Sequence, residues 1–156
     1  MQERGAEQRA IFRRWPAGVS VVVADVDGRR AGLTVSSLLS LSLDPRLVGI
    51  SIALDASLHE LLREAGEWGA SILSGDQEHL AQHFARGVPP IALWNGIEVR
   101  EDDPRLLTGA AAWLTARTVD QFRTGDHTFF VAELLTLEEG RAPSSLVYVH
   151  RGYHAL

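Results

Sequence analysis

The most informative part of the chain is GLTVSSLLSLSLDP, residues 32–45, in which hydroxyl-bearing and aliphatic side chains alternate. The alternation changes phase between Ser36 and Leu39, and such a change indicates a bend or bulge in a strand. Thr34 and Ser36 then share one strand face, and the bend turns Ser37 and its neighbouring backbone N–H groups toward the same region. This arrangement predicts a neutral anion cradle. A half-exposed strand running into a serine-rich turn is the competing interpretation, which composition alone favours.

Short elements precede this stretch. Ala6–Trp15 is expected to form a helix, which Pro16 ends. Val19–Ala24 is a continuous, largely β-branched run, as is typical of a strand. The Asp27-Gly28 pair favours a hairpin turn, with Arg30–Val35 as the returning strand. The chain therefore enters the serine-rich stretch from a β-hairpin.

Further strands are expected along the rest of the chain. Their ranges are Leu47–Ala53, Trp68–Leu73, Ala110–Val119, Thr128–Leu137 and Leu146–His150. Many strands with only brief helices between them favour a closed or partly closed antiparallel barrel over a doubly wound sheet. At 156 residues, the chain is expected to form a single domain spanning residues 1–156.

Two helices are expected between these strands. The first begins with the capping-box spacing of Ser57 and Glu60 and ends at Gly66. The second is expected to be capped by Asp76 and to end before Gly87.

Composition excludes several kinds of chemistry. The chain has no cysteine, so disulfides, thiolate nucleophiles and cysteine-bound metals are excluded, and any redox activity requires a cofactor. A formal net charge of -5 argues against a nucleic-acid partner. All basic residues are arginine, so a ligand phosphate would meet arginine, hydroxyl or backbone N–H groups. The sequence has neither a membrane-spanning stretch nor a signal core, which predicts a cytoplasmic protein without a membrane partner.

Nucleotide and metal motifs are also missing. The sequence has no GxGxxG or Walker pattern, so a nicotinamide cofactor would bind in another way. His79 and His83 have ligand-like spacing, but no third ligand is evident, and a solvated helix face is the simpler interpretation. No metal site is predicted.

Residues 32–45, which end in Asp44-Pro45, resemble the flavin-binding strand of the flavin reductase-like, FMN-binding split-barrel family. Four further segments resemble the family in the same order. They are AGVSVV at 17–22, SIAL at 51–54 with Ser57, SGDQ at 74–77 with Leu80-Ala81 and Phe84-Ala85, and GDHTFF at 125–130. The resemblance implies a mainly β fold with short α-helices, an antiparallel six-stranded split β-barrel. The loop Val88–Trp94 diverges from the family, which leaves specificity open.

The resemblance also implies a function. It points to an NAD(P)H:flavin oxidoreductase that reduces FMN or FAD with NADH or NADPH, as the reductase component of a two-component flavin-dependent monooxygenase. The implied partners are a flavin-dependent oxygenase and a second copy of the chain in a homodimer. Two alternatives stay open: an FMN-binding split-barrel oxidoreductase acting on another substrate, and a non-catalytic flavin-binding oligomeric protein.

Site residues follow from the same resemblance. The implied cofactor-binding residues are Gly32, Leu33, Thr34, Val35, Ser36, Ser37, Ala53, Leu54, Ser57, Phe84, Arg86, Tyr153 and His154. Arg86 would meet the flavin phosphate, and His127 is the candidate catalytic residue on the nicotinamide side. A turn histidine bonded to Asp126 is an equally good interpretation of His127, because Asp-His pairs are common structural units.

Overall fold

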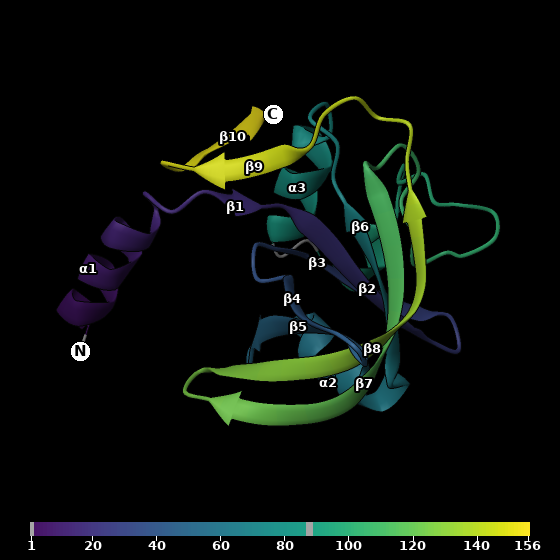
Figure 1. Cartoon of the computed structure of the whole chain (residues 1–156), viewed down its shortest axis with the longest axis horizontal. Helices are drawn as coiled ribbons and strands as arrows, with labels where there is room; N and C mark the ends of the chain where they lie inside the picture. Colours follow the sequence, from purple (N-terminus) through teal and green to yellow (C-terminus); the bar gives the residue numbers. More distant parts are fainter. Residues whose placement is uncertain (1, 87–88) are drawn as a thin grey trace.

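The computed structural model describes residues 2–86 and 89–156, and its main feature is a strongly curved antiparallel sheet (Figure 1). This sheet has seven strands in the order β3-β2-β6-β7-β8-β5-β4. Their bounds are β2 Ser20–Val26, β3 Arg29–Val35, β4 Leu39–Leu43, β5 Arg46–Ala53, β6 Glu67–Ile72, β7 Ala112–Thr124 and β8 His127–Glu139. A smaller sheet joins β1 (Ala17–Gly18), β9 (Leu146–Val149) and β10 (Gly152–Ala155) in the order β1-β9-β10.

The two edge strands of the large sheet, β3 and β4, are consecutive in the chain. Only residues 36–38 separate them, at the predicted bend. The Ser37 hydroxyl donates to the Ser51 carbonyl and accepts from the Ser51 N–H, at 3.0 Å in each case, which ties the linker to β5. The sheet therefore curves so far that its two edge strands are joined by one short linker. They are not hydrogen-bonded to each other as neighbouring strands. The predicted antiparallel split-barrel fold is confirmed, although the large sheet has seven described strands where six were expected.

Irregular pairing accounts for the curvature. The register between β7 and β8 shifts between Thr115 and Ala116 and again between Thr118 and Asp120. Such bulges bend a strand and increase its twist. Figure 1 shows both long strands bending through the body of the molecule.

The predicted hairpin is confirmed. Asp27 and Gly28 join β2 to β3 with φ angles of 52° and 84°, the positive values that a two-residue hairpin turn requires. The other predicted strands are present with ends shifted by a few residues, whereas β4 and β10 were not predicted as strands. Their side chains are mostly exposed, so hydrophobic patterning gives a weak signal there.

The core lies on both faces of β2. Val22 and Ala24 face one cluster, which contains Trp68 and Phe130, while Val21 and its alternating neighbours face a second cluster. A strand buried on both faces reads as a continuous apolar run rather than an alternating one. This explains the pattern seen in the sequence at Val19–Ala24.

Four helices are described, α1 Gln2–Phe12, α2 Ser57–Ala65, α3 Glu78–Ala85 and α4 Pro90–Leu93. The first predicted helix exists, but it begins and ends earlier than Ala6–Trp15. None of the described helices is long and apolar enough to cross a membrane.

The predicted end of α2 at Gly66 is confirmed, whereas the predicted N-terminal caps of α2 and α3 are wrong. Ala56 is the N-cap of α2, so Ser57 is already helical, and Glu60 accepts a hydrogen bond from His59 Nδ1 at 2.9 Å. Gln77, not Asp76, is the N-cap of α3, because Asp76 is engaged by the Ser74 hydroxyl. The expected end of that helix at Gly87 lies outside the described residues; the described helix ends at Ala85.

Candidate functional site

The free edge of β3 is the centre of the candidate site. α2 packs beside β3, and so do α3 and α4. Alternate side chains along β3 face opposite sides: Leu33 packs into the cluster that contains α2, whereas Thr34 donates a hydrogen bond to the Ala81 carbonyl of α3 at 2.6 Å. An edge strand presents unpaired N–H and C=O groups. The helices thus leave a polar backbone edge between them.

A cavity of about 140 Å³ lies at the C-terminal end of β3. Its lining residues are Val19, Thr34, Val35, Ser36, Ala85, Tyr148 and Tyr153. A second cavity of about 410 Å³ shares Ser36 and Tyr148 with it and is bordered by Arg9, Arg13 and Trp15. Four predicted cofactor residues, Thr34, Val35, Ser36 and Tyr153, therefore meet at one place, although 117 positions separate Ser36 from Tyr153 in the chain.

Tyr148 was missed by the sequence analysis. Its ring lies 5.0 Å from the ring of Tyr153, between centroids, and both line the smaller cavity. Burial is the main reason why the pKa of Tyr153 is raised, and its hydroxyl therefore stays protonated. The alternation of Leu146, Val147 and Tyr148 in a predicted strand was the available signal, because it places Tyr148 on the same face as the buried Leu146.

Gly32 and Phe84 belong to the packed interior. Phe84 is 2% exposed, and a Cβ on Gly32 would lie 2.9 Å from its ring. Phe84 also packs against Trp94, with ring centroids 5.3 Å apart. These two residues therefore pack against each other beneath the surface of the site. The Ser37 hydroxyl is also occupied within the protein, by its hydrogen bonds to the Ser51 backbone.

A second group of predicted residues gathers where β5 ends. Ala53 pairs with His127 across the sheet, and the Leu54 N–H donates to the Asp126 carbonyl at 3.0 Å. Ser57 follows at the start of α2. The backbone pairing of β5 with β8 thus brings Ala53, Leu54 and His127 together.

The side chain of His127 is 43% exposed, and its Nδ1 lies 2.7 Å from Asp126 Oδ1. This hydrogen bond, and then the charge of His127, lowers the pKa of Asp126. An ionised Asp126 fixes the ring and directs Nε2 away from itself. The contact is compatible with both a structural and a substrate-facing histidine.

Arg86 and His154 are less closely placed. Arg86 is exposed at the C-terminal end of α3, next to Ala85 of the small cavity. His154 is exposed on β10, adjacent to Tyr153 but on the alternate strand face.

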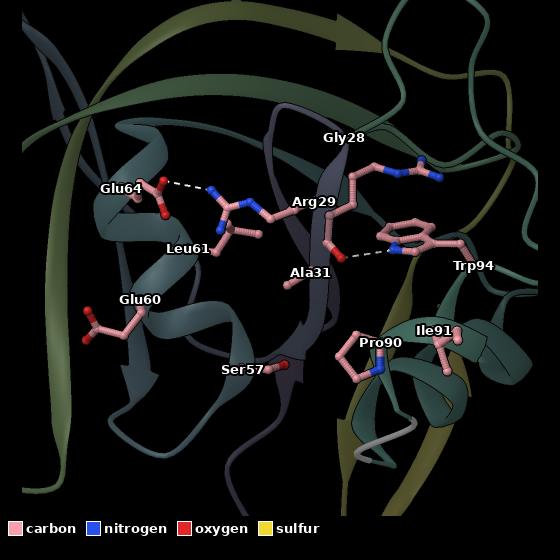
Figure 2. A pocket seen from close by; sticks show the side chains of 11 residues that line it. Gly28, Arg29, Ala31, Ser57, Glu60, Leu61, Glu64, Pro90, Ile91 and Trp94 are labelled. Atoms are coloured by element: carbon pink, nitrogen blue, oxygen red, sulfur yellow. Dashed lines mark hydrogen bonds and ion pairs between the residues drawn. The ribbon is translucent and has the colours of Figure 1, made fainter.

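A larger pocket of about 540 Å³ lies at the other end of β3 (Figure 2). It is bordered by α2, which contributes Ser57, and by the segment after α3, which contributes Trp94. Arg30 lies with its guanidinium 4.1 Å from the centre of the Trp94 ring, and Trp94 Nε1 donates to the Arg30 carbonyl at 3.2 Å. Trp94 belongs to the loop whose sequence diverges from the split-barrel family.

The donor set along the edge fits a flavin nucleotide. A flavin offers a flat ring with hydrogen-bonding edges and a polar tail with phosphate. The chain offers an unpaired strand edge, the hydroxyls of Ser36 and Ser57, and the guanidinium of Arg86, with tyrosine rings beside them. Neutral hydroxyl groups and the positively charged guanidinium of arginine are both suitable hydrogen-bond donors to phosphate.

The curved sheet, with its unpaired edges at one linker, places the chain in the class of antiparallel split-barrel proteins. Residues 12–156 match the flavin reductase like domain, and the chain belongs to this family.

Two relatives and one solved structure match this chain over most of their own length. The reductase component of 4-hydroxyphenylacetate 3-monooxygenase from Thermus thermophilus is 35% identical, over 92% of this chain and 91% of the relative. An NADH:riboflavin 5'-phosphate oxidoreductase from Streptomyces pristinaespiralis is 36% identical, over 86% and 77%. Among solved structures, BorF, the flavin reductase component of a bacterial two-component tryptophan halogenase, has a TM-score of 0.88 at 32% identity, with 97% of this chain and 98% of BorF covered.

Proposed function

We propose that the protein is an NAD(P)H-dependent flavin reductase that reduces FMN or FAD. Membership of the flavin reductase like family supports this function, as do relatives named for NADH:flavin oxidoreduction. The structural observation that carries the proposal is the free edge of β3, where Thr34, Val35 and Ser36 meet Tyr153 around a cavity.

The flavin and nicotinamide supply the electronic chemistry, since a hydride passes from the nicotinamide to the flavin ring. The chain has to hold two planar groups in register, and good alignment alone removes about 7–11 kcal/mol of barrier in well-oriented reactions. In this proposal the edge of β3 binds the flavin, and Arg86 meets its phosphate. Ala53 and Leu54 line the ring. His127 lies at the same strand end as these two residues and orients the nicotinamide.

The direct test is a steady-state assay with both nicotinamides and both flavins. The purified protein is expected to accelerate oxidation of NADH or NADPH in the presence of FMN or FAD. Oxidation no faster than in the protein-free control would refute the proposal.

Replacing His127 by alanine is expected to raise KM for the preferred nicotinamide about tenfold, the loss of one good polar contact. Flavin affinity should change little, because the β3 edge is untouched. Steady-state kinetics and a flavin titration measure the two effects. His79→Ala, an exposed histidine on α3, is the matched control and should behave as the wild type. A His127→Ala enzyme with unchanged KM would identify His127 as a structural turn residue.

We further propose that reduced flavin passes to a separate flavin-dependent oxygenase. The Thermus thermophilus relative is the reductase component of such a monooxygenase. A cytoplasmic location and a single-domain organisation remain predictions.

We also propose that the protein is a homodimer. An apolar groove of about 400 Å³ beside β4 is lined by Leu38, Leu43, Leu134 and Leu137, among others. Leu43 is 85% exposed and Leu137 is 57% exposed. None of the described residues of α1 is buried, and such a short helix is marginal in water without a packing partner. A second copy of the chain would cover these surfaces.

The double variant Leu43→Asp/Leu137→Asp is expected to weaken the dimer about tenfold or more, because a carboxylate pays a desolvation cost in an apolar interface. Light scattering across a dilution series measures this. Val119→Asp, an exposed apolar residue on β7 outside the groove, serves as the control. A monomeric wild-type protein would contradict the proposal.

A further inference from the structure

The histidine His59 of α2 is a buried polar group that the proposed function does not use. It is 4% exposed, and its Nε2 lies 2.7 Å from the Thr128 hydroxyl oxygen of β8. Its Nδ1 lies 2.9 Å from Glu60 Oε1, and its ring meets the Phe130 ring edge-on, with centroids 5.8 Å apart. Hydrogen bonds at both nitrogens, together with this packing, hold the ring in one orientation.

The contact with Glu60 fixes the direction of the hydrogen bond to Thr128. The hydrogen bond from His59 is the main cause that lowers the pKa of Glu60, so the ionised carboxylate only accepts. Nδ1 therefore carries a proton, and Nε2 of the neutral ring accepts from the Thr128 hydroxyl. The three groups are connected as in a catalytic triad, but Thr128 is only 6% exposed, so its hydroxyl is closed to a substrate. The arrangement fits support of a neighbouring residue rather than a nucleophile.

Both ends of this hydrogen bond lie next to residues of the candidate site. His59 follows Ser57 by two positions in α2, and Thr128 directly follows His127 in β8. Adjacent side chains of a strand point to opposite faces, so a Thr128 side chain that points inward leaves His127 on the outer face. One planar peptide unit joins the two residues. A displacement of Thr128 relative to α2 therefore carries His127 with it.

The hydrogen bond from α2 restrains a direction that the sheet itself leaves free. Ile52 pairs with Thr128 and Ala53 with His127, and this backbone pairing holds the start of β8 within the sheet. Side chains stand roughly perpendicular to a sheet, so the bond between Thr128 and His59 acts across it. The two restraints together fix the strand end in both directions.

We propose that His59 is a positioning residue of the reductase, which sets the place of His127 against the nicotinamide by holding Thr128. The inference rests on the proposed function, which gives His127 the task of orienting the nicotinamide. His59 itself touches neither ligand in this proposal. Functional side chains must be held within about 0.5 Å of the productive geometry, and this requires supporting residues whose own orientation is fixed.

The variant Thr128→Val removes the hydroxyl and keeps the shape of the side chain. KM for the preferred nicotinamide should rise about fivefold, the loss of one hydrogen bond, and by less than in His127→Ala. His59→Phe keeps a ring against Phe130 but removes the same hydrogen bond, so it should raise KM by the same factor. Thr128→Ser retains the hydroxyl and should restore most of the loss. Calorimetric titration with the oxidised nicotinamide gives Kd, which should follow KM, apart from turnover.

Thr115→Val is the matched control for a general loss of stability. Thr115 is also a threonine of the large sheet at 6% exposure, and its hydroxyl shares a hydrogen bond of 2.6 Å with the Thr136 hydroxyl. Its removal should lower Tm about as much as Thr128→Val does. KM and Kd for the nicotinamide should nevertheless stay at their wild-type values. Circular dichroism verifies the folding of each variant.

A double-mutant cycle with His127→Ala separates positioning from a merely structural role. Thr128→Val should raise KM and Kd about fivefold in the wild type and leave both unchanged in His127→Ala. The same increase in both backgrounds overturns the inference, and so do unchanged constants in folded Thr128→Val and His59→Phe. A His127→Ala protein with wild-type constants overturns it as well, while the reductase function stands. A wild-type protein that does not accelerate nicotinamide oxidation refutes that function itself, before any variant is compared.

Discussion

Replacement of Ser36 by leucine is expected to weaken flavin binding about a hundredfold, roughly the loss of a hydrogen bond to a charged group. Ser36 lines both cavities at the end of β3, and its side chain is exposed, so the change fills ligand space without disturbing the core. Thermal unfolding should remain as in the wild type. Titration of the purified variant with FMN and FAD provides the measurement.

Two other serine variants sharpen this experiment. Ser145→Leu changes an exposed serine that lines neither of these cavities nor the groove beside β4, and it should keep wild-type affinity. Ser37→Leu should lower stability instead, since Ser37 both donates to and accepts from the Ser51 backbone. Unchanged affinity in a folded Ser36→Leu protein would mean that the end of β3 does not bind the flavin.

Replacement of Gly32 by valine is expected to destabilise the protein by about 1–3 kcal/mol, the usual cost of overpacking a core. A Cβ at this position would lie 2.9 Å from one Phe84 ring carbon and 3.4 Å from Val23 Cγ2. For a chain of this size each kcal/mol corresponds to about 2–4 °C in Tm. Calorimetry or a thermal scan followed by circular dichroism records the change.

Gly18→Val is the matched control, because a Cβ there meets no described atom within 4 Å. Its Tm should equal that of the wild type. A smaller partner should relieve the crowding, so Phe84→Leu combined with Gly32→Val should be more stable than the sum of the two single changes predicts. A Gly32→Val protein as stable as the wild type would show that α3 moves away freely.

The sequence predicted best those features that depend on local chemistry. The Asp27-Gly28 turn and the buried run of β2 follow from backbone preference and apolar continuity, and both were predicted correctly. The predicted N-terminal caps failed, because a side chain expected to cap α2 or α3 is engaged elsewhere: Asp76 with Ser74, and Glu60 with His59. Capping patterns depend on these competing partners, which only the folded structure reveals.

The candidate site was predicted in part for the same reason. Thr34 and Ser36 could be placed on one face from alternation alone, and the resemblance supplied Tyr153. The pocket at the other end of β3 was missed, since Arg29, Leu61 and Trp94 come from three separate segments that carry no shared motif. Long-range packing determines such a neighbourhood, and a single sequence does not display it.

The unpaired seam between β3 and β4 has a consequence for how the protein behaves when it is empty. A flavin bound along that seam would supply hydrogen-bond partners for strand-edge backbone groups that no neighbouring strand pairs. Flavin binding would then stabilise the barrel. At a free flavin concentration of a hundred times the dissociation constant, the free energy of unfolding would rise by about 2.7 kcal/mol. A reductase that releases its flavin at each turnover would thus alternate between a more stable, flavin-bound barrel and a less stable, flavin-free one.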